Sequence, residues 1–173
     1  MLASFETGLK PEQETAARVR ASQGGDRAAF GLIYQQYSRM IHGILLAHVP
    51  WGDAEDVMQD VFLRALRQLD DLRQPEAVGS WLAAIARNAA VDYRRRLRPV
   101  SELSDAATTR PAAEAFEVLD RLKELPEAYR ETLILRLVEG MTGPEIAERT
   151  GMTHDSVRVN LCRGMKMLRE KLA

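Results

Sequence analysis

Basic, amide and aromatic side chains occur together between positions 81 and 96. The stretch contains Trp81, Arg87, Asn88, Tyr93, Arg94, Arg95 and Arg96. Cations can follow the phosphates of a single nucleic-acid strand, and aromatic faces can stack on its unpaired bases. The stretch therefore predicts a surface that holds a separated strand. A core position is the other interpretation of Trp81, because it lies beside Leu82 and Ile85 in an apolar stripe, and both interpretations are open for Tyr93.

A second group of side chains, just upstream, is acidic. It consists of Asp53, Glu55, Asp56, Gln59 and Asp60. Carboxylates repel DNA phosphates, so this group favours a basic protein surface as its partner. A solvated helix face with no partner is the alternative interpretation.

Residues 142–168 have the spacing of a helix-turn-helix, in which two helices meet at a fixed angle through a tight turn. Ala147 is small where the helices approach each other, Gly151 permits the turn, and Val157 enters the core. A capping box is predicted at the start of the first helix, from Thr142 and Glu145, and Thr153 with Asp155 favours the start of the second. A plain bundle with a solvated basic helix does not require this spacing.

The second helix of such a motif places its N-terminal half in the major groove of DNA. The residues predicted to face base edges are Thr153, His154, Asp155, Ser156, Arg158 and Val159. Farther along the helix, Arg163 and Lys166 are predicted to contact the phosphate backbone.

Catalytic and metal-binding patterns are absent from the sequence, so we expect no catalytic residues, no metal and no cofactor. The three histidines are scattered at His42, His48 and His154, and no glycine-rich phosphate loop occurs. Because Cys162 is the only cysteine, neither an intrachain disulfide nor a thiolate cluster can form.

With 24 basic and 25 acidic residues, the chain has no uniformly basic coat. No apolar run reaches the roughly 20 residues of a membrane span, so we expect a cytoplasmic protein without stable membrane insertion.

The apolar residues recur at helical spacing almost everywhere, which predicts an all-α fold. We expect Asp53 and Ser80 to cap the helices that contain the acidic and arginine-rich stretches. In the acidic helix, Leu66 is expected on the buried face, and Leu137 with Val138 is expected to line a helix that begins at Pro126. The apolar period disappears in residues 99–111, which predicts a flexible linker between two small helical domains.

Three segments, in this order, resemble the extracytoplasmic-function (ECF) branch of the sigma-70 family. They are DAEDVMQDVFLRALRQL (53–69), SWLAAIARNAAVDYRRRLR (80–98) and LPEAYRETLILRLVEGMTGPEIAERTGMTHDSVRVNLCRGMKMLREKL (125–172). The first is similar to the family's helix that docks on core RNA polymerase. The second is similar to its promoter-melting and minus-ten helix, and the third to its domain that reads the minus-thirty-five element.

The resemblance implies a sigma factor that positions core RNA polymerase on promoter DNA while the polymerase supplies the chemistry. It implies a region 2 domain at 1–98, a linker at 99–112 and a region 4 domain at 113–173. The resemblance implies that the acidic group binds the polymerase and that the arginine-rich stretch recognises the minus-ten element. It implies that the second helix of the helix-turn-helix recognises the minus-thirty-five element. An anti-sigma factor is the implied regulator, and we expect a monomer in the free state.

The recognition helix departs from the family pattern at four positions, which hold Val159, Asn160, Gly164 and Met165. Each missing direct DNA contact costs about 1–3 kcal/mol, so weak binding or an unusual consensus is expected. Two rival functions are a sigma mimic that binds only an anti-sigma factor, and a stand-alone helix-turn-helix repressor. The intact arginine run argues against the mimic, and these short helices leave little room for the ligand pocket of a repressor.

Overall fold

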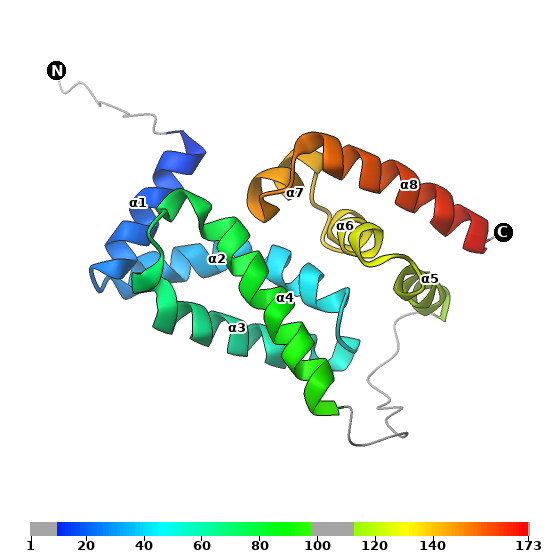
Figure 1. The fold of residues 1–173 in the computed structure, drawn as a ribbon, viewed down its shortest axis with the longest axis horizontal. Helices are drawn as coiled ribbons and strands as arrows, with labels where there is room; N and C mark the ends of the chain where they lie inside the picture. Colours follow the sequence, from blue (N-terminus) through cyan, green and yellow to red (C-terminus); the bar gives the residue numbers. More distant parts are fainter. Residues whose placement is uncertain (1–9, 98–112, 173) are drawn as a thin grey trace.

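The computed structural model describes residues 10–97 and 113–172, which form eight α-helices and no strand within those ranges (Figure 1). The all-α prediction is therefore confirmed. The helices are α1 (Pro11–Gln23), α2 (Arg27–Leu46), α3 (Ala54–Gln68), α4 (Val78–Leu97), α5 (Ala113–Lys123), α6 (Glu127–Leu137), α7 (Gly143–Thr150) and α8 (His154–Leu172). The predicted linker at 99–112 lies outside the described residues.

Helices α1 to α4 form one group around α2, which packs against the other three. The Asp26 carboxylate starts α2 by accepting hydrogen bonds from the backbone N–H groups of Ala28 and Ala29. Fully buried side chains along α2, including Ile33 and Ile41, form the centre of this core.

Helices α5 to α8 form the second group, in which α6 is the central helix. Its core includes Leu122 of α5, Leu133 of α6, Ile146 of α7 and Leu168 of α8. The two groups also pack against each other: α2 lies against α6, and α4 lies against α7 (Figure 1).

Two of the predicted caps are wrong in detail. Asp53 does occupy the N-cap position of α3, but its side chain makes no capping hydrogen bond. Helix α4 begins at Val78, before Ser80, because a 3₁₀ turn at Pro75–Ala77 leads directly into it. The Ser80 hydroxyl instead donates a hydrogen bond to the Ala77 carbonyl, 3.0 Å away.

Three leucine and valine positions predicted as core are exposed. Leu66 of α3 is exposed, and so are Leu137 and Val138 at the end of α6. In α6 the residues from Glu131 to Leu135 are all buried, because this helix packs against α8 on one side and α2 on another. A helix buried between two neighbours has no single apolar stripe, so periodicity misplaces its core-facing side chains.

No helix among the described residues is both long enough and apolar enough to cross a membrane.

Candidate polymerase and nucleic-acid interfaces

The acidic group lies on the solvent side of α3. Glu55, Asp56, Gln59 and Asp60 are exposed, while Val57, Val61, Phe62 and Ala65 are buried on the opposite side. Asp53 is half-buried, and its carboxylate accepts a hydrogen bond from the Tyr93 hydroxyl. Four of the five predicted polymerase-binding side chains therefore share one open surface, and the fifth is engaged within the protein.

Two leucines continue the same surface of α3. Leu63 is 51% exposed and Leu66 is 49% exposed, at helical spacing from Asp56, Gln59 and Asp60. Large apolar side chains next to exposed carboxylates are typical of a surface that buries a protein partner. The apolar period wrongly predicted a buried Leu66 and gave no role to Leu63. The position of Leu63 on this surface follows from its helical spacing of seven residues from Asp56 and three from Asp60.

The buried residues of helix α4 lie before its last two turns, and its arginine run lies at its C-terminal end. Leu82, Ile85, Ala86 and Ala89 are buried against the first core. Trp81 and Tyr93 are half-buried and pack against the same core, which favours the core interpretation for both rings. The exposed members of the predicted minus-ten group are Asn88, Arg94, Arg95 and Arg96.

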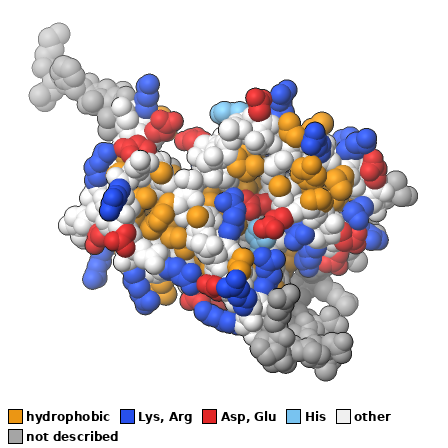
Figure 2. Space-filling model, viewed as in Figure 1, with side chains coloured by type: hydrophobic (Ala, Val, Ile, Leu, Met, Phe, Trp, Pro, Cys, Tyr) orange, Lys and Arg blue, Asp and Glu red, His pale blue; other side chains and the backbone are white. Residues whose placement is uncertain are grey.

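The basic side chains of this group do not form one continuous patch. Arg94, Arg95 and Arg96 project at the C-terminal end of α4, where Lys and Arg side chains gather at the lower edge of the molecule (Figure 2). Arg87 lies two to three turns earlier and is half-buried against α6. Its guanidinium donates two hydrogen bonds to Glu131, at 3.1 and 2.6 Å. The described structure therefore leaves the arginine run free and engages Arg87.

The helix-turn-helix has the local geometry that the sequence predicted. Thr142 and Glu145 make a reciprocal capping box at the start of α7. Gly151 ends α7 in the left-handed region, with φ of 75°, and Val157 is 1% exposed. Thr153 precedes α8, and its hydroxyl accepts a hydrogen bond from the Ser156 backbone N–H at 3.1 Å. The prediction of this motif is confirmed.

Helix α8 presents the predicted minus-thirty-five group on one open surface. The exposed residues are Thr153, His154, Asp155, Ser156, Arg158, Val159, Arg163 and Lys166. Arg158 donates a hydrogen bond to Asp155, one turn earlier, at 3.1 Å. Both side chains of this ion pair are largely in solvent, so a phosphate or a guanine edge can compete for the Arg158 guanidinium at little cost.

The four unusual positions of α8 do not all lie on its open surface. Gly164 is buried against α6, where an added Cβ atom would lie 3.0 Å from Leu133 and 3.2 Å from the Cβ of Tyr129. Asn160 is half-buried and donates a hydrogen bond to the Thr132 hydroxyl at 3.3 Å. Gly164 thus permits close packing of α8 on α6 and does not face the side that carries the predicted DNA contacts.

Within residues 10–97 and 113–172, no group of three or more His, Cys, Asp or Glu side chains is arranged to hold a metal ion. The single cysteine, Cys162, is exposed on α8.

Comparison with known proteins places both helical groups in one family. The sequence model of sigma-70 region 2 matches residues 33–100, and that of sigma-70 region 4 matches residues 115–168. The chain is 31% identical to the ECF RNA polymerase sigma-E factor of Escherichia coli strain K12, over 89% of this chain and 92% of the relative.

Two solved structures extend the comparison to the fold. CnrH, in complex with the cytosolic domain of CnrY, is 26% identical and aligns with a TM-score of 0.64 over 92% of this chain and 97% of that one. The sigma factor RpoE of Bartonella quintana, in complex with the anti-sigma factor NepR, is 22% identical and aligns with a TM-score of 0.57 over 82% of this chain and 94% of its own length. The second likeness indicates a shared fold.

Proposed function

Because this chain belongs to the ECF branch of the sigma-70 family, we propose that it binds core RNA polymerase and directs the enzyme to specific promoters. Sigma factors are regulatory subunits, and in this proposal the polymerase supplies the nucleotidyl transfer. The observation that supports the proposal best is the separation of charge: an acidic surface on α3, an arginine run at the end of α4, and an exposed recognition helix in α8.

In this proposal the exposed side of α3 docks on the polymerase. Asp56, Gln59 and Asp60 supply charge and hydrogen-bond acceptors, and Leu63 and Leu66 supply the apolar area that a carboxylate cluster lacks. Charge complementarity raises the rate of encounter and fixes the orientation, while apolar burial lowers the rate of dissociation.

The two DNA-binding surfaces would then act at different promoter elements. The arginine run of α4 would follow the strand that separates at the minus-ten element. Helix α8 would enter the major groove at the minus-thirty-five element, with Arg158 at base edges and with Arg163 and Lys166 at phosphates. Because each surface is small, useful affinity requires both to be engaged through the polymerase at once.

We also propose that an anti-sigma factor regulates this chain. The structure of CnrH, which aligns with the higher TM-score of the two solved relatives, is of a complex with the cytosolic domain of CnrY, and the family resemblance also implies an anti-sigma partner. A cytoplasmic location follows from the proposed role, because the polymerase and its template are there.

Reconstitution with purified core RNA polymerase tests the proposal. We expect the chain to bind the core enzyme at low ionic strength, and the holoenzyme to initiate on genomic fragments at starts that share a minus-ten and a minus-thirty-five sequence. A sigma mimic would produce no such transcripts. A stand-alone repressor would bind duplex DNA tightly without the polymerase, and either result would refute the proposed function.

A further inference from the structure

The two helical groups contact each other through glycines on both sides. A Cβ atom added at Gly79 of α4 would lie 2.4 Å from the Arg149 carbonyl oxygen of α7. At Gly43 of α2 it would lie 2.7 Å from the Leu135 side chain, and at Gly151 it would lie 2.7 Å from the Cβ of Ser80. At Gly79 and Gly151 the added atom would meet a backbone oxygen or a Cβ atom, which cannot turn aside, and this is the pattern of closely packed helices rather than of two groups in loose contact.

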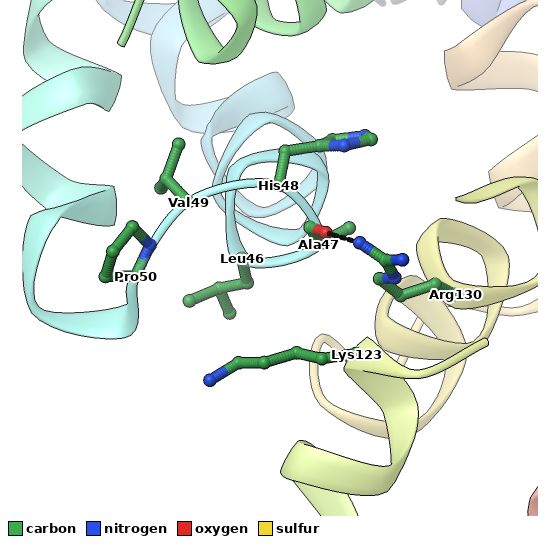
Figure 3. A pocket seen from close by; sticks show the side chains of 7 residues that line it. All are labelled: Leu46, Ala47, His48, Val49, Pro50, Lys123 and Arg130. Atoms are coloured by element: carbon green, nitrogen blue, oxygen red, sulfur yellow. Dashed lines mark hydrogen bonds between the residues drawn. The ribbon is translucent and has the colours of Figure 1, made fainter. Parts of the chain in front are cut away.

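Three arginines join the two groups by donating hydrogen bonds to backbone carbonyls. Arg130 of α6 donates to the Ala47 carbonyl at the end of α2, at 3.0 Å (Figure 3). Arg149 of α7 donates to the Gln36 carbonyl at 3.0 Å, and Arg39 of α2 donates to the Glu139 carbonyl after α6. The Arg130 contact also places a cation at the C-terminal end of a helix, where the helix dipole favours it.

The centre of this interface is a buried carboxylate. The side chain of Glu131 is 8% exposed and lies on α6, yet both of its side-chain partners, Arg87 and His48, belong to the other group. Arg87 of α4 donates two hydrogen bonds to it, and His48, 2% exposed, lies with Nε2 3.2 Å from Oε2. The other ring nitrogen of His48 has no hydrogen-bond partner among the described residues, and the Glu127 carboxylate lies 3.5 Å from it. A carboxylate this buried is tolerated only while its partners stay in place.

This closed arrangement conflicts with simultaneous binding to two promoter elements. The positions that name the minus-ten and minus-thirty-five elements place them about 25 base pairs apart, or roughly 85 Å of B-form DNA at 3.4 Å per step. The longest helix of the second group, α8 with 19 residues, is about 28 Å long, which is far shorter than this separation. In the closed chain α4 and α7 touch, and Arg87, a member of the minus-ten group, is held by Glu131.

We propose that the free chain inhibits itself by closing across this interface, with Glu131 as the latch that holds Arg87, and that it must open before it can engage polymerase and promoter. The inhibitory part of this inference rests on the proposed function, whereas the closure itself does not. Because only the open fraction binds, the apparent affinity for the polymerase is lowered in proportion to that fraction.

Closure can be measured directly on the free chain. The native Cys162 on α8 is exposed, and a second cysteine at Asp70→Cys, also exposed, places a label on the other helical group. With spin labels at both positions, double electron–electron resonance reports the distance between the groups. We expect a narrow, short distance to dominate the distribution for the otherwise unchanged chain, with a minor population at longer distances.

Two variants open the interface by independent routes. Glu131→Gln removes the charge of the latch and retains its shape. Gly79→Ala introduces a methyl group against the Arg149 backbone, while it favours α4 itself because alanine is the better helix former. Each has a matched control: Glu124→Gln removes an exposed carboxylate whose partners, Lys171 and Arg121, lie in its own group, and Gly31→Ala adds a methyl group where nothing lies within 4 Å.

We expect both opening variants to give longer and broader distances, and to bind core polymerase about 3- to 10-fold more tightly, which corresponds to a closed fraction of roughly two-thirds to nine-tenths. The controls should match the unchanged chain in both assays. If the unchanged chain already gives distances as broad as those of the variants, closure is refuted. If the variants open without tighter polymerase binding, self-inhibition is refuted. If the distances change as expected but no form of the chain binds polymerase, closure is supported and the proposed sigma activity is the part that fails.

Discussion

The Tyr93 hydroxyl of α4 donates a hydrogen bond to the Asp53 carboxylate at the start of α3. This bond explains why Asp53 occupies an N-cap position without capping the helix, since its carboxylate turns toward α4. It also joins the helix proposed to dock on polymerase to the helix proposed to hold the separated strand. Burial, together with the hydrogen bond and the negative charge of Asp53, raises the pKa of Tyr93 to about 12.

Tyr93→Phe should lower the free energy of unfolding by about 0.5–1.5 kcal/mol, because it removes one hydrogen bond to a charged acceptor that remains partly accessible to water. Thermal unfolding measures this change. The raised pKa makes the contribution complete below pH 10, the ordinary value, and lost as the pH rises through about 12. An unchanged melting temperature would show that the bond contributes nothing to stability.

Reversing charge on the exposed side of α3 should weaken polymerase binding without unfolding the protein. The double substitution Asp56→Arg with Asp60→Arg is expected to lower the affinity for core polymerase about tenfold or more, or roughly 1.4 kcal/mol, because two attractive contacts become repulsive. Both sites are exposed, so stability should change by no more than about 0.5 kcal/mol. Asp70→Arg with Asp71→Arg makes the same change of charge elsewhere on the surface and should leave binding intact. Equal losses in the two double variants would mean that net charge, rather than this surface, controls binding.

Two substitutions in α8 should separate base contacts from phosphate contacts. Arg158→Ala is expected to cost about 1–3 kcal/mol of promoter binding by the holoenzyme and to relax the base preference at one position of the minus-thirty-five element. Lys166→Ala should weaken binding uniformly across sequences and lower the salt slope by about 1. Competition among a set of minus-thirty-five sequences at two salt concentrations distinguishes the two effects. If Arg158→Ala weakened binding equally for all sequences, Arg158 would contact the phosphate backbone and not a base.

Closure of the two helical groups should depend on pH in both directions. Burial alone would raise the pKa of Glu131, but the hydrogen bonds from His48 and Arg87 outweigh it, and the pKa is lowered. The contribution of Glu131 is therefore complete above its ordinary pKa of 4.5 and lost as the pH falls through the lowered value. The hydrogen bond with Glu139 raises the pKa of His42 despite burial. Its contribution is complete below the ordinary value of 6.5 and lost as the pH rises through the raised value.

Closure should therefore be strongest between about pH 4.5 and 6.5. The other charged groups near these sites are Glu127 beside His48, Arg39 at the Glu139 carbonyl, and Glu55, whose charge also acts on His42. The spin-label distance, recorded from about pH 4 to 8.5, should broaden at both ends, and His42→Gln should remove the change on the alkaline side. A distance that stays constant across this pH range would show that Glu131 and His42 do not control closure.

The charged and polar groups of the candidate site were largely predictable from the sequence, whereas their partners were not. Helical spacing placed Glu55, Asp56, Gln59 and Asp60 on one surface of α3, and the structure agrees. The same spacing gave no sign that Asp53 turns toward Tyr93 or that Arg87 turns toward Glu131, because these pairs are 40 and 44 residues apart in the chain.

The sequence by itself determined the local structure of the helix-turn-helix: the capping box of Thr142 and Glu145 and the left-handed turn at Gly151. Each depends on atoms within a few residues of one another, so residue type and spacing suffice to specify it. Only the tertiary structure decided that α6 is buried on two sides, that Leu66 is exposed, and that Glu131 holds Arg87. These features arise when two helical groups pack together, and such packing sums many weak contacts between distant segments that no local pattern encodes.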